Sequence, residues 1–254
     1  MTIVQAAGTL GSSAVLVVGA HAFDAEVMAG AACVGYADAG NRVVLLHLSQ
    51  GELGHRTLEA AEYARQKRRE AEDAARILGA EAVFFDLPDG GVPRGDDLAH
   101  RVARIIREVR PAIVIGHWRG SWHKDHVAAH HAMVQGVFFA ALPTFDTTLP
   151  AHAPRDVLFA ENWEDDEGFR PEVLVDTTSG HERWLAAIRA YAIGRGELGE
   201  FRYLDYYESL ARMRGCLAGV ERAEAFMRVP RSILVGLGQF VVGTVGTADV
   251  APLP

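Results

Sequence analysis

The sequence has little cysteine, no concentrated positive charge and no long apolar run. Cys33 and Cys216 are its only cysteines, so neither a disulfide framework nor a cysteine-ligated zinc cluster is expected. The 33 Asp and Glu residues outnumber the 25 Lys and Arg residues, which gives a formal net charge of −8. Nucleic acids and anionic membranes attract concentrated positive charge, so we expect neither as a partner.

The chain also lacks the segments that direct a protein into or across a membrane. No apolar stretch approaches the ~20 residues that span a bilayer. No basic residue precedes the first apolar run, as one would in a secretory signal. We therefore expect a cytoplasmic protein.

What the chain does have is enough apolar material for one large core. Hydrophobic residues make up 49% of its 254 residues, a length that fits one domain. Neither an internal repeat nor a linker rich in Pro, Gly or Ser divides it. We expect a single domain over residues 1–254.

Short β-branched runs alternate with longer helical patterns over the first 140 residues. The expected strands cover 14–18, 43–48, 83–85 and 113–115, and the expected helices cover 26–39, 58–78, 97–109 and 125–139. Gly79 stands where glycine commonly ends a helix. This alternation predicts an α/β fold, with a Rossmann-like, doubly wound and mostly parallel sheet.

The pattern is weaker beyond residue 150. Two strands are expected at 156–159 and 173–175, and two helices at 178–192 and 203–217. The apolar, glycine-rich tail from Ser232 to Val245 is interpreted as an edge strand or a subunit contact.

Polar residues capable of chemistry concentrate in the loops that follow the strands. In open α/β sheets, ligands bind outside the carboxyl ends of the strands. His21 and Asp24 follow the first expected strand, and His126 follows the fourth. A catalytic zinc ion takes three nitrogen or oxygen ligands and keeps a fourth position open. The sequence therefore predicts a Zn²⁺ site of His21, Asp24 and His126, although Asp24 could also cap the following helix.

Five segments resemble one known family, the LmbE-like or PIG-L deacetylases. These are zinc hydrolases that remove acetyl groups from N-acetylglucosamine-type substrates. Residues 20–26 resemble the family's Ala-His-Pro-Asp-Asp-x-Glu motif, and residues 123–126 its His-x-Asp-His motif. The loop 48–54, the helix 69–79 and the segment 214–226 also have counterparts in the family.

The resemblance implies a role for each matching residue. His21, Asp24 and His126 match the family's zinc ligands. His123 matches the histidine that stabilises the tetrahedral intermediate or protonates the leaving amine, and Asp125 the residue that orients this histidine. The partner it implies is a small-molecule substrate, an amino sugar or a small acid. Because relatives are often oligomers, we also expect a homo-oligomer.

One residue departs from the family pattern at a chemically critical position. The family deacetylases use the first aspartate of Asp-Asp as the general base, and this chain has Phe23 there. Phenylalanine cannot accept a proton. Glu52, in a loop that ends an adjacent strand, is the best substitute, although it could simply cap or solvate its loop. The 4-oxalomesaconate hydratases of the same superfamily look similar in lacking that aspartate, and there the glutamate matching Glu52 is thought to handle the proton.

Three hypotheses remain open from the sequence. The first is a zinc-dependent hydrolase that removes an N-acyl group from an amino sugar or related small amide, with Glu52, His123 and Asp125 as catalytic residues. The second is a zinc-dependent hydratase or lyase with Glu52 as its base. The third is a metal-binding protein without turnover. The hydrolase ranks first because its predicted ligands and its His123–Asp125 pair are both present.

Overall fold

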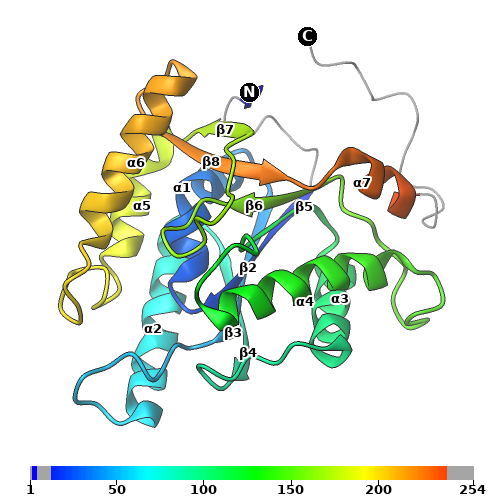
Figure 1. Cartoon of the computed structure of the whole chain (residues 1–254), viewed down its shortest axis with the longest axis horizontal. Coiled ribbons are helices and arrows are strands. Elements are labelled where there is room, and N and C mark those ends of the chain that lie inside the picture. The colour runs from blue at the N-terminus through cyan, green and yellow to red at the C-terminus, as the bar shows by residue number, and fades with distance from the viewer. Residues whose placement is uncertain (1, 5–12, 239–254) are drawn as a thin grey trace.

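A computed structural model describes residues 2–4 and 13–238, and these residues form one α/β domain around a single sheet (Figure 1). The strand order is β1-β7-β8-β6-β5-β2-β3-β4. β8 runs antiparallel to its neighbours β6 and β7, and the other pairings are parallel. The strands are β1 (Thr2–Val4), β2 (Ala14–His21), β3 (Arg42–Ser49), β4 (Glu81–Leu87), β5 (Pro111–Gly116), β6 (Asp156–Ala160), β7 (Val173–Asp176) and β8 (Ala223–Arg228). The predicted α/β, doubly wound and mostly parallel fold is confirmed.

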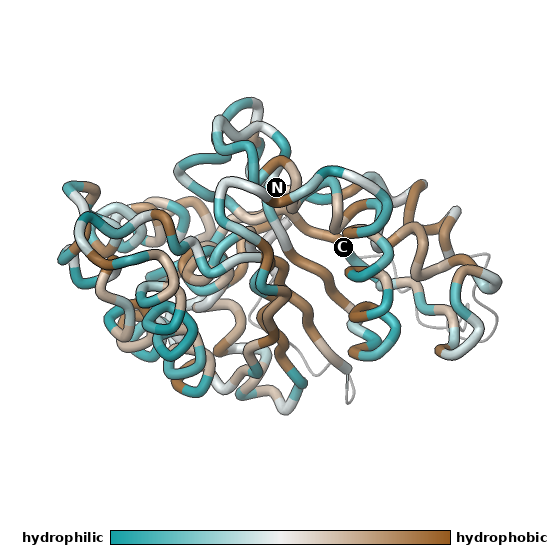
Figure 2. The backbone as a smooth tube through the Cα atoms, turned by 90° about the horizontal axis from the view of Figure 1, so that it is seen from below, coloured by the Kyte–Doolittle hydropathy of each residue, from teal (hydrophilic) through white to brown (hydrophobic). Residues whose placement is uncertain are grey.

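Helices cover both faces of the sheet. They are α1 (Asp24–Asp38), α2 (Ala60–Leu78), α3 (Asp96–Val109), α4 (Lys124–Ala141), α5 (His181–Ile188), α6 (Tyr203–Ala218) and α7 (Arg231–Gly238). Successive side chains of a strand point to opposite faces, so Val15 and Val17 of β2 pack with α1, α2 and α5, while Leu16 and Val18 pack with α3 and α4. Figure 2 shows the result, with hydrophobic strands in the middle and more hydrophilic helices outside. None of the described helices combines the length and the hydrophobicity needed to cross a membrane.

The second half of the chain departs from the sequence prediction at the helix expected over 178–192, at β8 and in the tail. The helix expected over 178–192 is a 3-10 turn, Thr178–Gly180, followed by the short α5. β8 was not expected, because its Ala-Glu-Ala start has little intrinsic preference for a strand. Its conformation comes instead from pairing with β6 and β7 on both sides.

The prediction of an edge strand in the tail is wrong for the part that the structure describes. Residues 231–238 form α7, and Leu234 and Leu237 turn toward the core on the α4 side of the sheet. A helix lets these two residues, three apart, reach the same face. The remainder of the tail, 239–245, lies outside the described residues.

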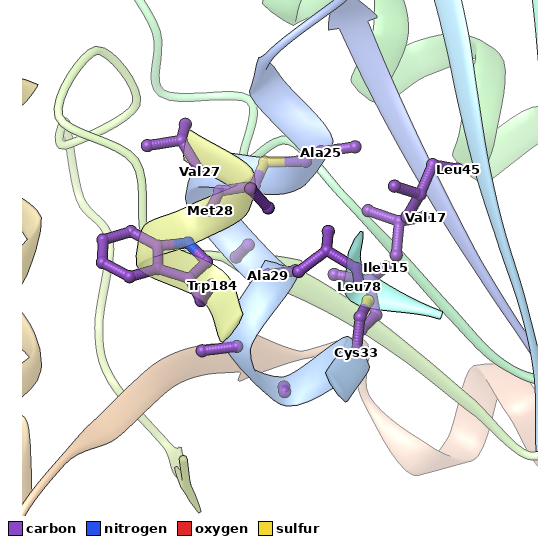
Figure 3. Packing of buried hydrophobic residues seen from close by; sticks show 14 of the residues in the cluster. Val17, Ala25, Val27, Met28, Ala29, Cys33, Leu45, Leu78, Ile115 and Trp184 are labelled. Atoms are coloured by element: carbon purple, nitrogen blue, oxygen red, sulfur yellow. The ribbon is translucent and has the colours of Figure 1, made fainter. Parts of the chain in front are cut away.

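Helix α1 is enclosed on all sides, which gives the residues at its start a fixed position. Figure 3 shows Val27 and Met28 beside Trp184 of α5, with Val17, Leu45 and Ile115 of the sheet nearby. The Trp184 indole N–H donates to the backbone oxygen of Glu26 over 2.9 Å. A Cβ added at Gly30 would lie 2.9 Å from Trp184 Cδ1, so only glycine allows this close approach.

A buried carboxyl group on β8 also holds α1. Oε1 of Glu224 accepts a hydrogen bond from the backbone N–H of Ala31 over 3.1 Å, and Oε2 accepts from Ala32 over 2.9 Å. No lysine, arginine or histidine among the described residues forms an ion pair with it. Burial raises the pKa of Glu224 to about 8.

We predict that Glu224 makes stability fall as the pH rises. A carboxyl group in an unfolded chain titrates near ~4.3, below the folded value of about 8. The stabilisation is complete below the unfolded pKa and is lost as the pH rises toward the folded one, at up to about 1.4 kcal/mol per pH unit. Urea unfolding at pH 5, 6, 7 and 8 should show this decline in the wild type and much less of it in Glu224→Gln. Equal slopes in the two proteins would contradict the assignment.

Candidate metal and active site

The chemically active residues gather where the direction of winding reverses between β2 and β5. From β2 the chain winds outward through β3 to β4, and then returns to β5 on the other side of β2. Such a switch point leaves a crevice at the carboxyl ends of the two strands. His21 ends β2, and His117 directly follows β5.

The turn from β2 into α1 brings His21 and Asp24 together. Oδ2 of Asp24 accepts a hydrogen bond from the His21 backbone N–H over 2.8 Å and lies 3.2 Å from His21 Nδ1. The turn passes through Phe23 at φ 104°, a left-handed conformation that a bulky side chain seldom adopts. Such strain is characteristic of functional turns.

The side chain of Phe23 belongs to the core. The residue is 4% exposed. Its ring packs edge-on against Tyr191 and Tyr203, with ring centroids 5.0 Å and 5.1 Å away. Neither Phe23 nor these two tyrosines can serve as the carboxylate base that the related deacetylases carry at this position.

Asp165 orients two imidazoles that follow β5. Its carboxylate accepts from His117 Nδ1 over 2.7 Å and from His126 Nδ1 over 2.8 Å. His126 Nε2 is then free to face Asp24, whose Oδ2 lies 3.5 Å away. Burial, and after it the adjacent His117, lower the pKa of His126 to about 4. His126 is therefore neutral near pH 7, as a metal ligand must be.

The predicted ligands His21, Asp24 and His126 lie together. Each offers one ligand atom, and these atoms lie within 4.8 Å of one another. Two other sets among the described residues satisfy the same condition, namely His21 with His123 and Asp125, and His117 with His126 and Asp165. The last set has two nitrogens engaged by Asp165, so it is better suited to orienting ligands than to binding an ion.

The charge around these rings suits a divalent cation. Five carboxyl groups lie at most 3.5 Å from the nitrogens of His21, His117 and His126. They belong to Asp24, Asp89, Asp125, Glu164 and Asp165. Three imidazoles cannot balance five carboxylates. A dication at this position would offset the excess negative charge, so the donor set fits the expected metal.

His123 and Asp125 lie beside the predicted ligands but not in the expected relation. The His123 ring is 4.8 Å from the His21 ring and 4.7 Å from the His126 ring, between centroids. The Asp125 carboxylate makes no hydrogen bond to the His123 ring: it lies 3.2 Å from His21 Nε2 and accepts from the backbone N–H of Gly90 over 2.7 Å. His123 Nδ1 accepts only from the Asp125 backbone N–H, over 3.3 Å.

The orienting role expected for Asp125 therefore falls on a different histidine. Its carboxylate contacts His21 and anchors the loop after β4, whereas no side-chain contact from it orients His123. Because α4 begins at Lys124, Asp125 lies inside the helix, and its side chain is buried.

Glu52 is held in the loop after β3. Oε1 accepts from the Asp89 backbone N–H over 2.9 Å, and Oε2 accepts from the Ser49 hydroxyl over 3.3 Å. The preceding Gly51 has φ 72° and passes so near His21 that an added Cβ would lie 3.2 Å from the His21 Cβ. Asp89 itself lies 3.2 Å from His21 Nε2 through Oδ1. Glu52 is thus next to this edge of the ligand group.

Two acidic residues of the site were missed by sequence reasoning. Glu164 and Asp165 lie in the loop after β6, and Glu164 Oε2 is 3.3 Å from His126 Nε2. Burial, and after it the charges of Asp24 and Asp165, raise the pKa of Glu164 to about 7. One signal could have found them. An acidic run, residues 164–167, follows the expected strand at 156–159, just as the loops of the predicted ligands follow their strands.

Comparisons with known proteins show which enzymes the chain is similar to. Residues 16–137 match the family model described as PIG-L, GlcNAc-PI de-N-acetylase. A 4-oxalmesaconate hydratase of Pseudomonas putida is 29% identical over 212 residues, which are 80% of each chain. A 1D-myo-inositol 2-acetamido-2-deoxy-alpha-D-glucopyranoside deacetylase of Kineococcus radiotolerans is 29% identical over 244 residues, covering 70% of this chain and 68% of that one.

A solved structure shows the same fold at similar sequence identity. It is the 4-carboxy-2-hydroxymuconate hydratase of Pseudomonas putida, which superposes with a TM-score of 0.79 at 27% identity. The superposition covers 86% of this chain and 96% of that one. The relatives are thus enzymes of two kinds, deacetylases and a hydratase, within one superfamily. With its two histidine–aspartate loops at the switch point, the chain is similar to the PIG-L, or LmbE-like, family over residues 16–137.

Proposed function

We propose that this protein is a metal-dependent hydratase that adds water across a carbon–carbon double bond of a small carboxylic acid. The observation that carries the proposal is the Phe23 ring, which occupies the base position of the deacetylases and is buried against Tyr191 and Tyr203. The similarity to a hydratase over 80% of both chains supports it.

Loss of the His123–Asp125 pair weakens the alternative of an acyl hydrolase. Without a carboxylate to orient it, His123 is less suited to supporting an oxyanion and a leaving amine. The partly exposed His123 ring beside His21 and His126 nevertheless keeps acyl hydrolysis as the second candidate. A retained metal site without turnover is the third.

His21, Asp24 and His126 would hold the ion, with zinc as the expected metal. When bound, such an ion supplies Lewis-acid chemistry that polarises a substrate oxygen and makes water more acidic. Asp165 sets the tautomer and direction of His126, and Asp125 does the same for His21. The chain itself therefore keeps both rings aimed at the common point.

Glu52 is our proposed base. Its two oxygens each accept one hydrogen bond, and a carboxylate oxygen has capacity for another. Glu52 would take one proton from the attacking water while the oxygen bonds to one carbon of the double bond. A proton is then delivered to the adjacent carbon, so that the net change is the addition of one water molecule. Glu164, near His126 on the other side of the ligand group, is the competing candidate for proton transfer.

The metal assignment predicts that Asp165→Asn weakens zinc binding about 10-fold to 100-fold, a typical cost of losing an orienting partner. The amide oxygen can still accept a hydrogen bond, but it lacks the negative charge that strengthens the hydrogen bonds from both imidazole N–H groups. Competition against a chromophoric chelator measures the affinity, and thermal unfolding checks the fold. Asp166→Asn is the matched control, because Asp166 is exposed and adjacent in sequence. Equal zinc affinity in the two variants would show that Asp165 does not support zinc binding.

A substrate screen tests the reaction class. The zinc-loaded protein should consume unsaturated di- and tricarboxylic acids, detected as loss of ultraviolet absorbance and as hydroxy-acid product by mass spectrometry. It should release no acetate from N-acetylglucosamine compounds above background. Acetate release that persists in the wild type, or that Phe23→Asp strongly increases, would favour the hydrolase instead.

The base assignment predicts that Glu52→Gln lowers kcat for hydration about 10²-fold to 10⁴-fold, the usual contribution of general-base assistance. Zinc content should stay unchanged, because Glu52 is not among the predicted ligands. Glu62→Gln on the exposed side of α2 serves as the control. If Glu164→Gln abolishes hydration while Glu52→Gln does not, the role of base belongs to Glu164.

A further inference from the structure

Lys67 is a buried cation whose function the metal site does not explain. The sequence has only two lysines, Lys67 and Lys124. Lys124 is exposed, whereas Lys67 of α2 is 4% exposed. Among residues 2–4 and 13–238, no carboxylate oxygen lies within 4.0 Å of its ammonium group. Lysine is almost never fully buried without a partner, and the described chain supplies no close anion for this group.

Three aromatic rings surround the ammonium group instead. Its Nζ lies 5.3 Å from the Tyr191 ring centroid, 5.6 Å from that of Phe23 and 5.9 Å from that of Tyr63. The faces of aromatic rings attract a cation and hold it in place. They carry no net charge, however, so among the described residues the positive charge is offset only by carboxylates more than 4.0 Å away, Asp24 and Glu70 among them.

The position of Lys67 relates it to the predicted metal ligands. Phe23, which its ammonium group faces, immediately precedes Asp24. Burial lowers the pKa of Lys67, and Asp24 and then Glu70 act in the opposite direction. The ammonium group is thus within electrostatic range of Asp24. A metal ion bound by Asp24 would offset part of the negative charge that this carboxylate offers to Lys67.

We propose that Lys67 binds a carboxylate of the substrate and thereby selects a small acid over a neutral amino sugar, an inference that rests on the proposed function. The replacement of the aspartate at position 23 is part of the same arrangement. An aspartate there would be a ready partner for the ammonium group, whereas the Phe23 ring leaves the positive charge available to substrate. A charge-assisted hydrogen bond to a carboxylate is among the stronger polar contacts in proteins.

Binding of a simple acid tests this without any turnover. Isothermal titration of the zinc-loaded, full-length protein would compare succinate with its neutral analogue succinamide. We expect Lys67→Met to weaken succinate binding about 10-fold to 100-fold and to leave any succinamide binding unchanged. Lys67→Arg should retain most of the affinity. Arg69→Met removes the same charge from an exposed position of α2 and is the matched control. Equal succinate affinity in the wild type and Lys67→Met overturns the proposal.

Kinetics separate this proposal from the proposed function. Once an acid that the protein hydrates is known, Lys67→Met should raise its KM about 10-fold or more with a smaller change in kcat. Esterifying the substrate carboxylate should remove the difference in KM between the wild type and Lys67→Met.

Hydration with an unchanged KM in Lys67→Met would support the hydratase function and refute the role of Lys67. Lys67-dependent succinate binding without hydration of any acid would support Lys67 and refute the hydratase. Thermal unfolding and zinc content of each variant show that the comparison concerns folded, metal-loaded protein.

Discussion

The carboxylate of Asp165 is the interaction on which the site depends. It accepts N–H groups from His117 and His126 and so joins the loop after β6 to the segment after β5. Because a neutral imidazole carries one N–H, this contact decides which nitrogen of His126 stays free. The free nitrogen faces Asp24, which the strained turn at Phe23 brings back toward His21. Three loops from three strands thus meet at one point.

The surroundings of Phe23 differ from the deacetylase motif more than the ligand group does. The histidines and carboxylates around the predicted metal position agree with the family pattern, while the position of the base is aromatic and belongs to the core. Lys67 lies against that same ring. Where the deacetylase motif has an aspartate, this chain has the apolar ring of Phe23 beside the buried Lys67. The difference removes one negative charge from the neighbourhood of Lys67. With a metal ion bound, the proposed site would offer positive charge from the ion and from Lys67, which would favour an anion over a neutral sugar.

Much of the first half of the fold and the core of the site could be predicted from local patterns. The strands β2, β3 and β5 are mostly buried runs of β-branched and apolar residues, and the edge strand β4 is partly buried. The helices between them end at signals such as Gly79, which adopts φ 78°. Beyond residue 150 those patterns are weaker. β8 is a strand because it fills the position between β6 and β7, a cause that its own six residues do not contain.

The sequence by itself determined which side chains stand at the carboxyl ends of β2 and β5, because strand and loop patterns are local and their order dictates the switch point. It therefore allowed His21, Asp24 and His126 to be expected together. Only the tertiary structure decided which carboxylate orients which ring, since Asp125 turns to His21 and Asp165 reaches His117 and His126 from 48 and 39 residues away. It also decided that Lys67 is buried beside Phe23. Such contacts depend on packing between distant segments, and neither residue spacing nor composition encodes the direction in which a side chain points.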